Sequence, residues 1–266
     1  MSSAKELLEA GKLNEAIQAM NEDVKRHPTD IQKRGLLAEL LCVSGRLERA
    51  DAQLEVILQQ DAKAAVAIAL MRQLIRADTA RKDFYASGRL PEFLDVPPPY
   101  LQSHIEASIH IREKRPGEAM RLLEQAEEQR PRIRGTCNGK QFDDLRDLDD
   151  LTAGLFEVYT STGKFYWIPA ERVHSIEFRK PQRTLDLIWR RAAMAVAGGP
   201  DGEVFVPATY CRDGADVPES ALLGRMTEWS GGETAPMRGL GQVCFLVGDD
   251  SVPIMEMENV IFEESA

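Results

Sequence analysis

The first half of the chain contains an internal repeat with a period of 34 residues. Three positions recur at this offset: Gly11, Leu13 and Ala16 return as Gly45, Leu47 and Ala50. The stretches EAIQAMNEDVKRHP (residues 15–28) and EAMRLLEQAEEQRP (residues 118–131) share a Glu-Ala start, and in both an alanine lies twelve residues before the final proline. One helical pair of this length cannot bury its own apolar stripe, so copies have to stack and share a core. The repeat therefore restricts this half of the chain to stacked helical pairs.

The spacing inside each copy indicates the type of repeat. Small residues stand twelve positions apart, where two helices would cross closely: Ala4 and Ala16, Ala38 and Ala50, Ala107 and Ala119. A 34-residue helix–turn–helix unit is typical of tetratricopeptide repeats, although most of their signature Trp, Gly and Tyr positions are absent here. We expect residues 1–130 to form an all-α, tetratricopeptide-like repeat domain of about seven helices, a number that follows from typical helix lengths. The prolines of residues 88–100 predict a non-helical connection within it.

After Pro131 the hydrophobic pattern changes to a period of two. Residues 155–169 alternate apolar and polar positions about a Ser-Thr-Gly turn, which is typical of a β-hairpin. Residues 194–210 and 242–262 each predict a strand, a turn with Gly and Asp, and a second strand. In residues 242–262 the second strand is long and alternates apolar and polar positions. RVHSIEF is a further strand, and TLDLIW is one helical turn. We expect a compact antiparallel β-rich domain over residues 154–266, with strands beginning only after about Gly154. The predicted fold class is α+β.

Residues 131–153 form an acidic segment between the two halves. It holds five aspartates in eight residues: Asp143, Asp144, Asp147, Asp149 and Asp150. The leucines at 145, 148 and 151 predict an apolar seam on a helix or 3₁₀ face, with Asp143, Asp147 and Asp150 on another face. The pattern does not fit a calcium loop. We interpret the segment as a structural or partner-facing acidic face, because charge runs are usually solvated. The alternatives are hydrogen-bonding anchors for the following domain and a metal or catalytic site.

No catalytic, metal or cofactor motif is apparent in the sequence. The stretch GLGQVC (residues 239–244) lacks the third glycine of a dinucleotide fingerprint, and the four histidines are far apart. We therefore expect no cofactor and no enzymatic activity. The net charge of −10 argues against a nucleic-acid partner.

The sequence also predicts where the protein resides. The longest apolar run is much shorter than the roughly 20 residues needed to cross a bilayer, and the N-terminus lacks the apolar core of a signal peptide. The four cysteines have no CxxC pair, which suits reduced thiols. We expect a cytoplasmic protein without membrane insertion.

The second half resembles a known family. The motifs that carry the resemblance are GTCNGKQFDDLRDLDD, LFEVYTSTGKFYWIPAERVHSIEFRKPQRTLDLIWR, GEVFVPATY, LGRMTEW and RGLGQVCFLVGDD, in this order. Together they are similar to the ImpE/TagJ family, accessory proteins of bacterial type VI secretion systems. The resemblance covers nearly the whole chain and is most specific from Gly135 to Asp250. It implies a helical-repeat part followed by a β-rich part.

The resemblance also implies a partner. Members of this family are not known as enzymes, so it implies an adaptor that binds the N-terminal helical segment of the small contractile-sheath subunit, TssB. It would thereby act near the ClpV ATPase that disassembles contracted sheath. The alternative function is an enzyme of unrecognised type that uses Asp143, Asp147 and Asp150, with or without a metal.

Repeat geometry predicts where an amphipathic partner helix would bind. The first helix of each tetratricopeptide pair lines the concave face, and an apolar and polar mixture there suits a guest helix. Taking Ala38 and Ala107 as crossing positions, the residues facing the groove are Gln32, Gly35, Glu39, Cys42, Val43, Leu101, His104, Ser108, Ile111 and Arg112. We expect Val43→Asp and Ile111→Asp to weaken binding while the fold survives.

Overall fold

Seven α-helices lie within the first 130 residues, as predicted. The computed structural model describes residues 3–199, 201–211 and 217–263. The helices are α1 (Ala4–Glu9), α2 (Leu13–Arg26), α3 (Ile31–Val43), α4 (Leu47–Gln60), α5 (Ala65–Ser87), α6 (Pro99–Arg112) and α7 (Pro116–Gln129). Local signals fix several ends. The Asp30 side chain accepts hydrogen bonds from the Gln32 and Lys33 amides at the start of α3, and Gly88, with φ of 84°, ends α5 in the left-handed region.

The rest of the chain is rich in antiparallel β-structure, which confirms the α+β class. Its strands are β1 (Gly135–Cys137), β2 (Lys140–Phe142), β3 (Leu145–Asp147), β4 (Leu155–Thr160), β5 (Phe165–Pro169), β6 (Val173–Phe178), β7 (Trp189–Val196), β8 (Gly202–Pro207), β9 (Thr227–Gly232), β10 (Ala235–Gly241), β11 (Cys244–Val247), β12 (Asp250–Pro253) and β13 (Asn259–Phe262). An eight-stranded sheet has the order β2-β1-β13-β6-β7-β8-β4-β5, beside a three-stranded sheet β12-β11-β3 and a ribbon β10-β9. Short helices connect them: η1 (Ala62–Ala64), η2 (Asp150–Thr152), η3 (Ala170–Arg172), η4 (Thr184–Leu187), α8 (Glu219–Leu222) and η5 (Ile254–Glu256).

The predicted hairpins are present where turn and alternation agree. The antiparallel pair β4 and β5 matches residues 155–169, with Leu155 opposite Pro169 and Tyr159 opposite Phe165. Strands β7 and β8 also pair across their predicted turn, and η4 is the predicted helical turn. Residues 88–98 form the predicted non-helical connection, in which Glu92 bridges Tyr166 along the edge of β5.

Two predictions of strand position were wrong, and one pair of strands was missed. Strands begin at Gly135, not after Gly154, so the acidic segment contains β1, β2 and β3 and is not an amphipathic helix. The long strand expected in residues 250–262 is two strands in different sheets, β12 and β13, separated by η5. The ribbon of β9 and β10 was not predicted. Strands β3 and β13 pair with strands that are distant in the sequence, β11 and β6, and local alternation does not encode such pairing.

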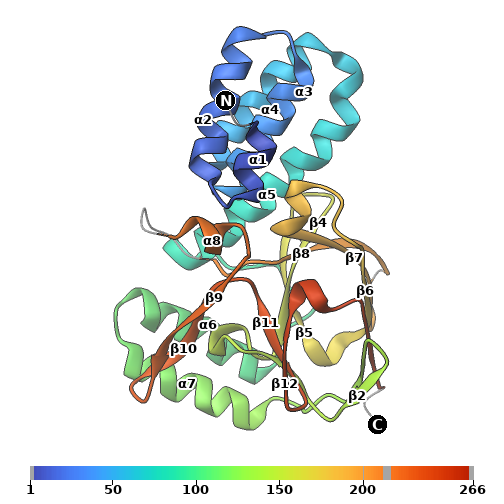
Figure 1. The fold of residues 1–266 in the computed structure, drawn as a ribbon. Coiled ribbons are helices and arrows are strands. Elements are labelled where there is room, and N and C mark those ends of the chain that lie inside the picture. The colour runs from blue at the N-terminus through green and yellow to red at the C-terminus, as the bar shows by residue number, and fades with distance from the viewer. Residues whose placement is uncertain (1–2, 200, 212–216, 264–266) are drawn as a thin grey trace.

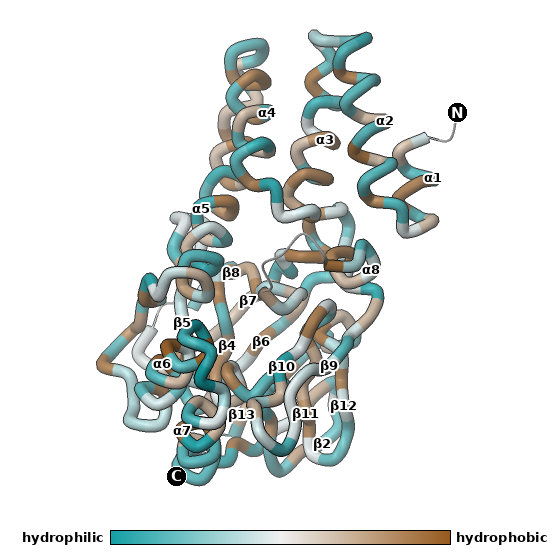
Figure 2. The backbone as a smooth tube through the Cα atoms, turned by 90° about the vertical axis from the view of Figure 1, so that its left-hand side faces the viewer, coloured by the Kyte–Doolittle hydropathy of each residue, from teal (hydrophilic) through white to brown (hydrophobic). Residues whose placement is uncertain are grey.

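The three repeat copies do not form one continuous stack. Helices α1 to α4 lie together at one end of the molecule, and the strands lie at the other (Figures 1 and 2). The 23-residue α5 runs from this stack onto β4 and β5. Helices α6 and α7 pack on each other, and they contact η2 and β10 in the β-rich part. The third copy is therefore a helical pair whose core is supplied by strands.

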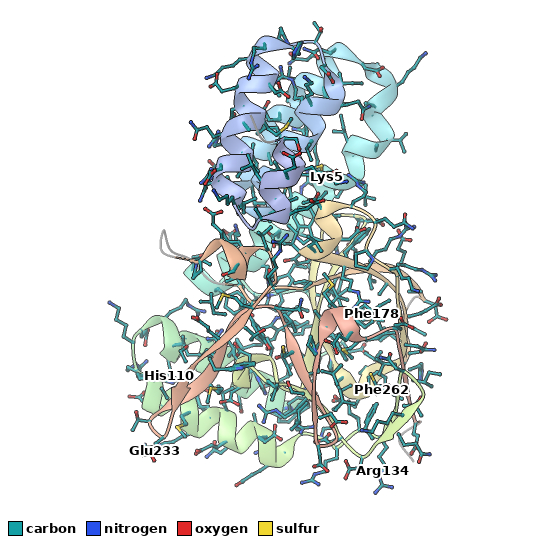
Figure 3. All side chains as sticks on the ribbon, in the orientation of Figure 1. Lys5, His110, Arg134, Phe178, Glu233 and Phe262 are labelled. Carbon is teal, nitrogen blue, oxygen red and sulfur yellow. The ribbon has the colours of Figure 1, made fainter. Side chains whose placement is uncertain are left out.

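The two parts of the chain share one hydrophobic cluster. It joins the buried faces of α2 to α7 with side chains of the large sheet, among them Tyr159, Trp167 and Trp189, which are at most 2% exposed. A second cluster fills the space between the large sheet and the three-stranded sheet, and includes Phe178 and Phe262, both labelled in Figure 3. The large sheet is thus covered by helices on one face and by β-structure on the other.

Candidate functional site

A cleft lies where the helical repeats meet the β-rich part, and we call it the junction cleft. It has a volume of about 470 Å³. Its lining comes from the end of α3 and the following turn (Cys42 to Arg46), from Asp78, Arg81 and Lys82 on α5, and from Ile188, Trp189, Thr209 and Tyr210 of the β-rich part. Helix α3 is the first helix of the second repeat copy, and α5 follows that copy. Two residues that were predicted for the concave face, Cys42 and Val43, are part of the cleft lining.

Below the junction cleft, buried charged groups join α5 to β4. The Arg81 and Glu157 side chains, 5% and 9% exposed, form an ion pair with Nη2 and Oε2 2.5 Å apart. Tyr85 and Trp167 also donate to Glu157, at 2.9 and 3.3 Å. Burial lowers the pKa of Arg81, but the Glu157 charge raises it more, so the guanidinium pKa lies well above its usual value. The guanidinium therefore stays charged, and its ion pair with Glu157 fixes α5 on the sheet.

A second buried contact on α5 supports the same arrangement. The Tyr159 hydroxyl of β4 donates to Asp78 Oδ1 at 2.6 Å. Burial raises the pKa of Tyr159 well above its usual value, and the Asp78 charge raises it further. The phenol stays protonated and serves as a hydrogen-bond donor.

The acidic segment anchors the two halves of the chain to each other. Asp144 accepts from Arg130, just after α7, at 2.5 and 2.9 Å. Asp149 accepts from Arg238 Nε of β10 at 2.7 Å, and its side chain is 2% exposed. Asp150 accepts from Arg146 and from the Met237 amide. The expectation of a solvated acidic face was wrong for this part of the segment, because distant arginines and backbone amides take up the carboxylate oxygens.

Asp147 is the most deeply perturbed carboxyl group of this segment. It accepts hydrogen bonds from Tyr210 Oη at 2.7 Å, Thr152 Oγ1 at 2.9 Å and the Asp149 amide at 2.9 Å. Burial raises the pKa of Asp147 to about 7, and the nearby Asp149 charge acts in the same direction. The side chain ties β3 to η2 and to the segment after β8, next to the junction cleft.

Comparison with known proteins gives matches to both parts of the chain. The family model described as ImpE protein matches residues 139–261, and a tetratricopeptide repeat model matches residues 7–74. The chain is 28% identical over 260 residues to the type VI secretion system accessory component TagJ of Pseudomonas aeruginosa, covering 98% of this chain and 91% of that protein. Residues 139–261 therefore carry an ImpE domain, and the chain as a whole is similar to TagJ.

A crystal structure of a Vibrio parahaemolyticus protein has the same fold. It is 27% identical, covers 98% of both chains and gives a TM-score of 0.92. The likeness therefore includes the arrangement of the repeats on the β-rich part. The tetratricopeptide match ends at residue 74, within α5, which agrees with the separate packing of α6 and α7.

The α3 residues predicted to bind a partner are only partly accessible. Gln32 is exposed, and a side chain added at Gly35 would meet nothing within 4 Å. Glu39 pairs with Arg183, at 2.5 Å. Cys42 and Val43 line the junction cleft but are only 2% and 3% exposed. Val43→Asp would therefore bury a carboxylate, and we now expect this substitution to destabilise the fold.

The α6 residues predicted for the same face do not form a groove with α3. Leu101, His104 and Ser108 are at most 3% exposed, because α6 packs against the β-rich part. His104 Nδ1 lies 2.7 Å from the Leu151 carbonyl oxygen, and burial lowers its pKa to about 4. Ile111 and Arg112 are half-buried, and Arg112 donates to the Phe84 carbonyl oxygen. The repeat pattern correctly predicted that Ala107 of α6 is buried at a helix crossing. It did not predict which surface the other residues of α6 face.

The α5 residues of the junction cleft were missed from the sequence. Asp78 and Arg81 are 9% and 4% exposed in a helix that matched the repeat pattern poorly. The sequence did contain a sign of their role, because the two charged residues interrupt an otherwise apolar face of the helix. Their partners lie 81 and 76 residues away along the chain, so the pairing itself was not readable.

The described residues bear on the metal-dependent form of the enzyme alternative. In residues 3–199, 201–211 and 217–263, no group of three His, Cys, Asp or Glu side chains could hold a metal ion. Asp147 and Asp150, two of the aspartates of the enzyme alternative, are engaged by protein donors. Across the same residues, no helix is long and apolar enough to span a bilayer.

Proposed function

We propose that this protein is a non-enzymatic, cytoplasmic accessory protein of a type VI secretion system. In this role it binds the N-terminal amphipathic helix of the small sheath subunit TssB and acts near ClpV-dependent sheath disassembly. The observation that carries the proposal is the full-length likeness to the TagJ component, which includes both the repeats and the β-rich part. The use of the aspartates as structural anchors supports an adaptor over an enzyme.

The proposed binding surface is the accessible stripe of α3. Gln32, Gly35 and Glu39 are spaced as one helical face, and the buried Cys42 continues this face into the junction cleft. A guest helix uses apolar anchors at i, i+3, i+4 and i+7, and the open space over Gly35 gives its backbone room to approach. The α6 residues are not part of this surface, because Leu101, His104 and Ser108 are buried and Arg112 is bonded to α5.

The test is binding of a labelled TssB N-terminal peptide, measured by fluorescence anisotropy. We expect Gly35→Gln to weaken binding about tenfold or more, since a side chain in the path of a closely packed helix removes contacts of hot-spot size. Gly117→Gln on α7 is the matched control, because its added side chain also meets no atom within 4 Å. Equal binding by both folded variants would exclude the α3 stripe. Failure of the unmodified protein to bind the peptide would reject the proposed partner.

A metal measurement addresses the enzyme alternative. We expect the dialysed protein to retain no stoichiometric divalent metal, because the aspartate oxygens are taken by arginine, hydroxyl and amide donors. Stoichiometric metal that is lost in Asp147→Asn and Asp150→Asn would favour the enzyme alternative.

A further inference from the structure

We infer that the junction cleft is a binding site for an anionic group, with carboxylate as the preferred chemistry. Its volume of about 470 Å³ is in the range of small-ligand sites, which is roughly 300–1,000 Å³. It would hold one or two acidic side chains of a protein segment, or a small dicarboxylate. The inference does not depend on the identity of the sheath partner.

The positive charges of the cleft are not balanced by equal negative ones. Arg81 is neutralised by Glu157, which lies beneath the cleft. In the described ranges, neither Arg46 nor Lys82 has a carboxylate within ion-pair distance, whereas Asp78 contributes one negative charge. The lining therefore carries a net charge of about +1 in a chain whose net charge is −10. A semi-enclosed cleft of this sign concentrates anions.

Lys82 is held in place by a neutral group. Its Nζ donates to the Gly45 carbonyl oxygen at 2.9 Å, which uses one of its three N–H donors. Gly45 adopts a φ of 73°, and a Cβ there would come within 2.9 Å of Lys82 Nζ. The glycine thus permits both the left-handed turn and the close approach of the ammonium group. Two donors of a positioned cation remain for a ligand.

Arg46 is fixed in a similar way. Its Nη2 donates to Asn14 Oδ1 at 2.6 Å, and Asn14 in turn donates to Glu219 through Nδ2 at 2.7 Å. The guanidinium is oriented by an amide, so its charge and its other N–H groups stay available. Positioned donors lower the ordering cost of binding.

Apolar side chains form part of the cleft lining beside these cations. Val43, Ile188, Trp189 and Leu222 line the same cleft, and they reduce the exposure of a bound carboxylate to water. An ion pair is stronger in such surroundings than on an open surface. The combination of two oriented cations with a partly apolar lining distinguishes this cleft from a solvated basic patch.

The test uses the full chain and three probes, namely glutarate, inorganic phosphate and a capped peptide with two glutamates. Binding is measured by isothermal titration calorimetry at low and moderate ionic strength. We expect saturable binding that weakens with salt. We also expect Lys82→Gln and Arg46→Gln each to weaken it by about tenfold or more, the loss typical of a hydrogen bond to a charged group.

Matched controls are Lys63→Gln and Arg49→Gln, which remove exposed cations outside the cleft. Saturation by the peptide but not by glutarate supports a protein source of the carboxylate, and the reverse supports a small molecule. Tightest binding of phosphate would overturn the carboxylate preference. Absence of saturable binding for every probe, or equal loss in the control variants, would overturn the site. Circular dichroism checks that all four variants remain folded.

Discussion

Asp149 and Arg238 form an ion pair that is almost completely removed from water. Their side chains are 2% and 10% exposed, and the Asp149 carboxylate also accepts the Gly239 amide at 2.9 Å. Because both charges are desolvated, each depends on the other. Replacing one of them leaves the second buried without compensation.

We predict that Asp149→Asn lowers the free energy of unfolding by about 3–5 kcal/mol, the cost of breaking a buried pair. The measurement is urea denaturation followed by circular dichroism. Asp143→Asn is the control, because Asp143 is exposed in the same segment, and its effect should stay within about 0.5 kcal/mol. Similar small losses for both variants would show that the Asp149 contact contributes little.

Asp147 gives the stability of the protein a specific pH dependence. Its folded-state pKa is about 7, above the roughly 3.9 of an unfolded aspartate. Between these values the folded state holds a proton that the unfolded state has released. This contribution is therefore fully present below about pH 4 and is lost as the pH rises through about 7.

We predict that the stability difference between the parent protein and Asp147→Asn is larger at pH 5 than at pH 8. The expected change is about 2–3 kcal/mol from this group alone. Unfolding free energies of both proteins at the two pH values provide the measurement, and taking the difference removes the other titrating groups. A constant difference would mean that Asp147 has the same pKa in both states.

At the level of elements, the sequence predicted a pair of helices or strands correctly where the two members are neighbours in the chain. The β4–β5 hairpin has its turn and alternation within residues 155–169. The α6–α7 pair was readable because Ala107 and Ala119, both fully buried, meet within one repeat unit. What α6 packs against was not readable, because its neighbour η2 lies beyond α7. The repeat pattern therefore pointed to the α3 residues that line the junction cleft, Cys42 and Val43. It did not point to the lining residues of α5 and β7.

His104 shows what holds α6 on the β-rich part. Its Nδ1 and the Leu151 carbonyl oxygen are 2.7 Å apart, so the neutral ring donates to a buried acceptor. We predict that His104→Leu lowers the free energy of unfolding by about 1–3 kcal/mol, because the carbonyl loses its partner. His104→Asn, whose amide can donate, should lose less. Thermal and urea denaturation can rank the two variants, with Gln102→Leu on the exposed face of α6 as the control; equal losses in both His104 variants would argue for packing alone.

On the scale of the whole molecule, the shared core makes the repeats and the sheet one folding unit. Phe84 of α5 packs on Trp167 of β5, with ring centroids 4.6 Å apart, and the Arg81–Glu157 pair lies beside them. If the repeats unfolded while the β-rich part stayed folded, the surface that the two parts bury against each other would become exposed to water. Since burial of apolar area is the main favourable term in folding, we expect the two parts to unfold together.

The three tryptophans allow this to be tested without labels, because all of them lie between residues 167 and 229. We predict coincident urea transitions by tryptophan fluorescence, which reports the β-rich part, and by circular dichroism at a helical wavelength, which mainly reports α1 to α7. Leu54→Ala on α4 removes a buried side chain far from every tryptophan in sequence, at a cost of about 2–5 kcal/mol. In a single cooperative unit this variant lowers both midpoints equally. If only the circular dichroism midpoint falls, the repeats unfold independently and the junction is a contact between two domains.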